Sequence, residues 1–150
     1  MSVIALLFER TSIPGSRPWR WLPLLALCAF LPLAAQATPL QDPEPIMVPP
    51  GMSEASIVKA IRLGAAKRGW LITKADPGHM EATINVRVHT AKVNIDYDTA
   101  KVAITYLGSE NLEYAEKNGQ RHIHGNYNKW VRNLSVDIAS ELALLPPDAK

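Results

Sequence analysis

Two histidines separated by one residue are the side chains in this sequence with the clearest potential for metal chemistry. His122 and His124 stand in the stretch RHIH, and residues two apart on a β-strand point to the same face. A structural zinc site needs four protein ligands and a catalytic one usually three. No metal-binding spacing relates the pair to the other candidate ligands, which are His79, His89, Glu113 and Glu116. We therefore prefer a solvated hairpin on which both histidines flank an inward Ile123, with metal binding by His122 and His124 as the alternative.

Three carboxylates could mimic the catalytic pair of a glycosidase. Asp96 and Asp98 share one face of a predicted strand, and Glu81 lies on the strand before it. Such a pair needs one carboxyl group whose pKa is raised by burial, which a wet sheet face does not provide. The sequence also lacks the serine-hydrolase, phosphate-loop and zinc-protease motifs. We therefore predict no enzymatic activity, no catalytic residue and no cofactor.

The polar stretch after the histidines is better explained by a helix start than by a binding motif. Asn126 and Asn128 stand where an asparagine side chain can accept from the first free backbone donors of a helix. Asn133-Leu134-Ser135 matches a glycosylation sequon, but it falls inside the predicted helix, where Leu134 must face the core. Capping and packing account for both patterns.

The polar face of the predicted sheet is the remaining candidate site. Its polar residues alternate with apolar ones, so helices that cover the apolar face would leave it free. A mixture of hydroxyl, carboxamide and charged groups suits a polymer such as a glycan, or an exported partner protein. The predicted partner surface comprises Thr83, Asn85, Arg87, Lys92, Asn94, Asp96 and Thr105.

Helical spacing predicts the elements at both ends of the domain. Residues 54–68 form the first helix, with Ser53 as its N-cap and Gly69 as its C-terminal stop. A second helix begins at Asn126 and ends before Pro146. Its apolar stripe consists of Tyr127, Trp130, Val131, Leu134, Ile138, Leu142 and Leu145.

A period of two predicts strands between the helices. After a short strand over 70–74 and a turn at 76–78, two alternating strands follow, and a tight turn at Thr99-Ala100 pairs Tyr97 with Val102 in a fourth. Residues 107–111 are a loop by composition, and Asn118-Gly119 predicts a small hairpin. The inward residues of the two alternating strands are Met80, Ala82, Ile84, Val86, Val88, Ala91, Val93, Ile95 and Tyr97.

Together these elements predict an α+β domain of two layers. An antiparallel four-stranded meander carries an N-terminal and a C-terminal helix on one face, in the order α-β-β-β-β-α, with the small hairpin before the last helix. The predicted organisation is a signal peptide over 1–37, a proline-rich tether over 38–52, the α+β domain over 53–145 and a tail over 146–150.

The predicted signal peptide determines what the mature chain can bind. The apolar run from Trp21 to Ala35 follows three arginines and ends in Ala35-Gln36-Ala37, the small-residue pattern of a cleavage site after Ala37. It is too short for a transmembrane span, and Leu27 before Cys28 disfavours lipid anchoring. The mature chain would be neutral and free of cysteine, so we predict no nucleic acid partner and no disulfide. Because the apolar run is short and is removed, we also predict no stable transmembrane segment.

Several segments resemble a family of small exported bacterial proteins and lipoproteins with no assigned function. They are NLEY at 111–114, HIHGNYNKWVRNL at 122–134, Gly69-Trp70 and Ile95-Asp96-Tyr97, and the likeness covers roughly residues 53–142. The family's closing segment is I-H-x-N-Y-N-x-W-[VI]-x-N-L. The resemblance implies export and this fold, and it lends no catalytic residue. We therefore expect a periplasmic or secreted, non-catalytic binding or envelope-associated module, whose partner is an envelope protein or a glycan.

Overall fold

The computed structural model describes residues 37–147, so the predicted signal peptide, except for Ala37, lies outside the described residues. Within that range no helix is long and apolar enough to cross a membrane. The elements, in chain order, are β1 Ala37–Pro39, β2 Ile46–Met47, α1 Glu54–Lys67, β3 Leu71–Asp76, β4 His79–Val86, β5 His89–Tyr97, β6 Lys101–Glu110, β7 Ala115–Lys117, β8 Gln120–His124 and α2 Gly125–Leu144.

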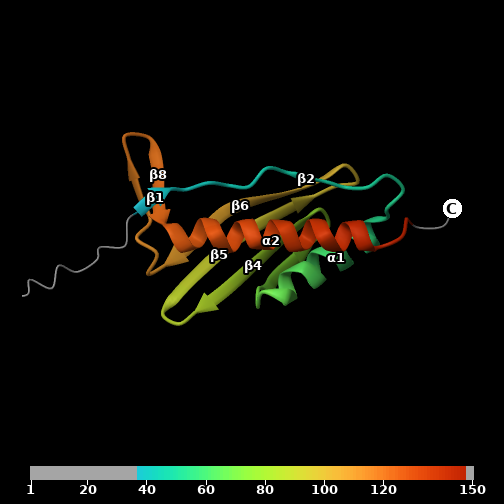
Figure 1. Ribbon diagram of the computed structural model, residues 1–150, viewed down its shortest axis with the longest axis horizontal. Coiled ribbons are helices and arrows are strands. Elements are labelled where there is room, and N and C mark those ends of the chain that lie inside the picture. The colour runs from blue at the N-terminus through green and yellow to red at the C-terminus, as the bar shows by residue number, and fades with distance from the viewer. Residues whose placement is uncertain (1–36, 148–150) are drawn as a thin grey trace, which may run out of the picture. The chain divides into compact units, whose positions relative to one another are not determined.

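A five-stranded antiparallel sheet forms the centre of the domain. Its strand order is β2-β6-β5-β4-β3, and Tyr97 pairs with Val102 as the turn at Thr99-Ala100 predicted. The helices α1 and α2 lie side by side over this sheet (Figure 1), and one apolar core joins residues of both helices to residues of β4, β5 and β6. The predicted α+β fold with both helices on one face is therefore confirmed.

The alternation of apolar residues places the core where the sequence predicted it. The inward residues Ala82, Val93 and Ile95 have no exposed surface, and the adjacent polar residues of the same strands remain in contact with solvent. Trp130 and Leu145 are only partly buried at the margins of the α2 stripe. The fully packed residues of that stripe are Tyr127, Val131, Leu134, Ile138 and Leu142.

The two helices approach each other closely at a glycine. The Ser53 side chain caps α1 by accepting from the backbone N–H of Ser56, and Gly69 has a φ of +78° just after the helix ends. In the middle of α1, a Cβ built on Gly64 would lie 2.8 Å from the backbone of Ile138 in α2. Only a residue without a side chain permits this packing distance.

The strand predicted to run through Val88 ends earlier. Val86 pairs with His89, so Arg87 and Val88 form a two-residue turn between β4 and β5. Arg87 has a φ of 57°, and Val88 is 70% exposed. The prediction that Val88 faces the core is therefore wrong, because the hairpin closes before the alternation reaches it.

The loop predicted at residues 107–111 is also wrong over most of its length, because β6 continues to Glu110. Ala91 pairs with Ser109 and Thr90 with Glu110, so the first residues of β5 keep a hydrogen-bonded neighbour. The register shifts between Lys92 and Val93, and the extra residue is absorbed there. The loop-like composition of these residues did not prevent strand formation, because β5 is a central strand whose backbone groups need partners on both sides.

The small hairpin forms as predicted, with an additional strand. Asn118 and Gly119 have φ values of 53° and 74°, as a tight two-residue turn requires, and they connect β7 to β8. β1 then pairs with the other edge of β8, so the hairpin is part of a three-stranded sheet in the order β1-β8-β7.

The proline-rich segment 38–52 is extended, as predicted, but it packs against the domain and is not a free tether. It supplies β1 and β2, which pair with β8 and β6. The N–H of Val48 donates to the carbonyl of Ala100 at 2.9 Å, and Val48 and Met52 are part of the core. Proline is compatible with such edge positions, where few backbone donors are needed. The folded domain therefore begins before residue 53.

Candidate functional site

Five of the seven residues predicted to form a partner surface share the uncovered face of the five-stranded sheet. Thr83 on β4 pairs with Lys92 on β5, and Asn94 on β5 pairs with Thr105 on β6. Their strand neighbours on either side point into the core, so these side chains point away from both helices. We call this surface the open face and define it by Thr83, Lys92, Asn94, Asp96 and Thr105.

The two remaining predicted residues lie at or beyond the end of this surface. Asn85 accepts a hydrogen bond of 2.9 Å from the hydroxyl of Thr90, its partner across the strands, and so marks the rim of the open face. Arg87 lies in the β4–β5 turn, because the hairpin closes at the pair Val86–His89. The prediction that Arg87 shares the sheet face is therefore wrong.

A group of paired charges borders the other end of the open face. The Nδ1 atom of His79 lies 2.6 Å from the Asp96 carboxylate, and the Lys74 ammonium lies 3.1 Å from Asp76 and 3.8 Å from Glu81. The hydrogen bond that Lys74 donates to Asp76, with the negative charges of Asp76 and Glu81, raises the pKa of Lys74. Three carboxylates thus share one ammonium and the His79 ring at solvated positions, where ion pairs add little stability.

The two aspartates predicted to share one strand face lie in different settings, because β5 ends at Tyr97. Asp98 lies in the β5–β6 turn, where its Oδ1 accepts from the N–H groups of Ala100 and Lys101 at 2.7 and 2.8 Å. Those backbone hydrogen bonds lower the pKa of Asp98, the opposite of what a general acid needs. Asp96 remains on β5, where its side chain is 57% exposed and lies beside His79.

The histidine pair has local partners in the structure. Both residues flank Ile123 on β8, and Ile123 is fully buried, as predicted. The Nδ1 atom of His122 lies 3.2 Å from the carbonyl of Gln120, and Nδ1 of His124 accepts from the N–H of Asn126 at 3.1 Å. His124 is therefore the N-cap of α2, a role predicted for Asn126 or Asn128. Across residues 37–147, no three His, Cys, Asp or Glu side chains are grouped to hold a metal.

Asn128 holds the N-terminal segment instead of capping the helix. Its side-chain amide donates to the carbonyl of Pro39 at 2.8 Å and to the hydroxyl of Thr38 at 3.2 Å, and its oxygen accepts from the N–H of Gln41 at 3.1 Å. Sequence reasoning missed this contact, because its partners lie almost ninety residues away along the chain.

Asp42 makes a second connection of the same kind. One carboxylate oxygen accepts from the N–H of Tyr106 in β6, and the other accepts from the Arg121 guanidinium in β8, both at 2.9 Å. This hydrogen bond to Asp42 raises the pKa of Arg121. One side chain thus joins the proline-rich segment to both sheets.

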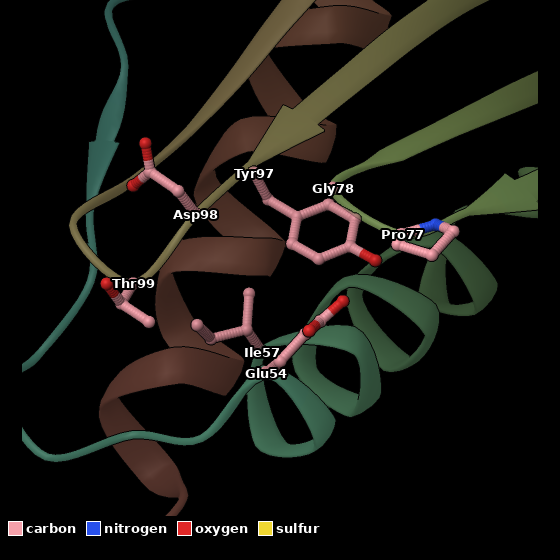
Figure 2. Close-up of a pocket in the computed structure, with 7 residues that line it drawn as sticks. All are labelled: Glu54, Ile57, Pro77, Gly78, Tyr97, Asp98 and Thr99. Carbon is pink, nitrogen blue, oxygen red and sulfur yellow. The ribbon is translucent and has the colours of Figure 1, made fainter.

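A small cavity of about 310 Å³ lies where the start of α1 meets two turns of the sheet. Figure 2 shows Glu54 and Ile57 of α1 on one side of it and the ring of Tyr97 on the other. The Tyr97 hydroxyl donates to the carbonyl of Asp76 at 3.4 Å. The cavity walls are mainly apolar. Their two carboxylates are those of Glu54 and Asp98, and that of Asp98 accepts hydrogen bonds within its own turn.

Two adjoining cavities lie beside the first half of α2, on the helix side of the sheet. Their volumes are about 360 and 220 Å³, and both are lined by Val86, Trp130 and Asn133. The larger one is also lined by Arg87, His89, Asn126 and Lys129, and the smaller one by Arg68, Trp70 and Ile84. We call the two cavities together the α2 groove. Its residues come from the α1–β3 connection, β4, the β4–β5 turn, β5 and α2, so no local sequence motif predicts it.

Comparison with known proteins found no family model and no curated sequence that matches this chain. The resemblance to an exported bacterial family therefore stays a prediction from the sequence. The function proposed below is supported by the placement of the residues described above.

Proposed function

We propose that this chain is an exported, non-catalytic binding module of the bacterial envelope, and that it binds a glycan or an envelope protein through the open face. The observation that carries the proposal is the position of both helices on the other side of the sheet, which leaves the open face uncovered. The apolar run before Ala35-Gln36-Ala37 supports export.

The chemistry of the open face suits a long polar partner. Thr83, Asn94 and Thr105 offer hydroxyl and carboxamide groups that both donate and accept hydrogen bonds. Lys92, which forms a 3.7 Å ion pair with Glu110, lies directly opposite Thr83 on the same face. These side chains project from paired strands, so little conformational freedom would be lost on binding. A shallow surface of this kind would contact several successive units of a polymer or peptide.

Site-specific crosslinking in the envelope tests this proposal. A photoreactive residue placed at position 83, 94 or 105 should give the same discrete crosslinked product, because all three side chains project from the open face. The matched control is position 136, since Val136 is 60% exposed on α2. Equal products from position 136, or none from the three face positions in an exported chain, would contradict the proposal.

The metal-binding alternative has a separate test. Zinc and copper would be titrated into the chain and into a His122→Ala/His124→Ala variant, with the melting temperature as the readout. Because the Nδ1 atom of His124 is engaged by the N–H of Asn126, coordination through that atom would also cost the cap of α2. Melting temperatures unchanged by either metal would exclude this alternative.

A further inference from the structure

The α2 groove concentrates positive charge without a balancing acidic residue in its walls. Arg68, Arg87 and Lys129 are its charged lining residues. Arg68 is paired with Asp137 at 2.6 Å, whereas Arg87 and Lys129 belong to none of the ion pairs formed within residues 37–147. The first turn of α2, which begins beside the groove, has no acidic residue to offset the positive helix end. The groove therefore favours an anion.

The other walls of the groove fit a sugar better than a simple inorganic anion. Asn126 and Asn133 each offer a donor and an acceptor, the combination that pairs with neighbouring hydroxyl groups. Trp130 and Val86 give apolar surface in both cavities, which a hydrated phosphate ion would not use. The Nδ1 atom of His89 donates to the carbonyl of Asn111 at 2.6 Å, which holds the ring where it lines the larger cavity.

Two further features concern residues that line this groove. Trp70, at the smaller cavity, is 2% exposed, and its buried Nε1 has no hydrogen-bond acceptor among the described residues. Arg87 keeps its cation at the rim even though its φ of 57° is a left-handed conformation that glycine or asparagine adopts more readily. This conformation belongs to the two-residue turn between β4 and β5, which places the Arg87 side chain at the larger cavity.

From these features we propose that the α2 groove is a binding site for an anionic saccharide, that is, a sugar unit carrying a carboxylate or a phosphate group. Arg87 and Lys129 would contact the anionic group, and the two asparagines would contact hydroxyl groups. The groove lies on the helix side of the sheet, opposite the open face, so this site is independent of the function proposed above.

Tryptophan fluorescence can report directly on this site. The sequence has four tryptophans, and a full chain carrying Trp19→Phe and Trp21→Phe would retain only Trp70 and Trp130, both of which line the groove. Trigalacturonate supplies carboxylates on a sugar, and glucose 6-phosphate supplies a phosphate. Galactotriose is the neutral match, and short polyglutamate and inorganic phosphate are anions without a sugar. We expect saturable spectral changes with a sugar anion at concentrations at least about tenfold below those of galactotriose.

Charge-removing variants test which residues carry the binding. Arg87→Gln and Lys129→Gln should each weaken binding of the sugar anion by about tenfold, the size of one charge-assisted hydrogen bond. Lys59→Gln is the matched control, because Lys59 is an exposed lysine on α1 that does not line the groove. Asn94→Ala on the open face should also leave this binding unchanged, which separates the two proposals.

Several results would overturn the inference. Galactotriose binding as tightly as trigalacturonate would remove the role of charge. Polyglutamate or inorganic phosphate binding as tightly as either sugar anion would assign the groove to acidic peptides or to simple anions. No saturable change with any probe would show that the groove is not a site for this class of ligand.

Discussion

At the scale of single residues, Asn128 and Asp42 show how polar side chains can fix a segment that has few backbone donors of its own. Prolines at 39, 43, 45, 49 and 50 remove backbone donors from the chain between residues 38 and 52. Asn128 forms hydrogen bonds with Thr38 and Pro39 of β1 and with Gln41 just after it, and Asp42 bonds the stretch between β1 and β2 to β6 and β8. Both residues therefore act over long distances in sequence, which local pattern reasoning does not detect.

Replacing Asn128 by alanine should release this segment. The change removes hydrogen bonds to Thr38, Pro39 and Gln41, so we expect a loss of about 1–3 kcal/mol in the free energy of unfolding. Amide hydrogen exchange at Gln41 should become faster. Asn126→Ala is the control, because Asn126 contributes to the cap of α2 through its backbone N–H. Equal destabilisation by both variants would show that Asn128 does not anchor the segment.

Tyr127 presents the opposite case, a buried hydroxyl without a partner. The side chain is fully buried, and its oxygen has no hydrogen-bond partner among the described residues. Because an unsatisfied buried polar group costs free energy, Tyr127→Phe should raise the free energy of unfolding by about 1 kcal/mol. A decrease in urea-unfolding experiments would mean that the hydroxyl has an acceptor in solution.

The same burial gives the protein a dependence on alkaline pH. Burial, and next the nearby Asp42 charge, raise the pKa of Tyr127 above the ordinary value of 10.0. Above that pH the unfolded chain loses the proton while the folded chain keeps it, so stability should fall as pH rises. Comparing urea unfolding at about pH 8 and about pH 10.5 should show a smaller fall for Tyr127→Phe than for the wild type.

At the scale of elements, the sequence predicted the buried faces but not all of the pairing partners. The periodic residues of α2 and of β4 to β6 indicate which side is buried, because burial alternates with helical or strand geometry. That pattern does not indicate at which residue a hairpin closes, so it predicts that Arg87 and Val88 belong to a strand. β1 and β2 were missed for a related reason, since their proline-rich sequence has no strand periodicity.

The two candidate sites differ in whether the sequence could predict them. The open face could be predicted because all its residues alternate along adjacent strands. The α2 groove could not, because it brings together residues near positions 68, 87 and 130. The packing of α2 beside both α1 and the β4–β5 hairpin places them side by side.

The contact between the two helices predicts an unusual response to an alanine substitution. In an exposed helix, glycine to alanine normally stabilises. At Gly64 the new Cβ would lie 2.8 Å from the Ile138 backbone, so Gly64→Ala should destabilise the fold by about 1–3 kcal/mol. Gly108→Ala serves as the control, because nothing lies within 4 Å of the built Cβ there. Thermal melts measure the effect, and equal melting temperatures of the two variants would contradict this packing.

At the scale of the whole domain, the N-terminal segment connects the two sheets. β1 belongs to the three-stranded sheet and β2 to the five-stranded one, and Asp42 between them contacts both β6 and β8. The segment also covers part of the outer edge of β6, an edge that would otherwise offer free backbone groups to another chain.

Removing this segment should therefore affect both stability and self-association. We expect a chain that begins at Val48 to melt at a lower temperature than one that begins at Thr38. It should also form larger species in size-exclusion chromatography with light scattering, since the β6 edge is uncovered. Identical melting and elution of the two chains would show that residues 38–47 contribute neither stability nor protection.

The aromatic contact between Tyr106 and Tyr114 has a spectroscopic consequence. The two rings are stacked, with centroids 4.7 Å apart and planes 10° apart, and Tyr106 also meets Tyr127 edge-on at 5.4 Å. Rings held in such a fixed, asymmetric arrangement give circular dichroism in the near ultraviolet. Tyr114 lies just before β7, so detachment of the smaller sheet on heating would abolish that tyrosine ellipticity while the far-ultraviolet signal of α1 and α2 persisted.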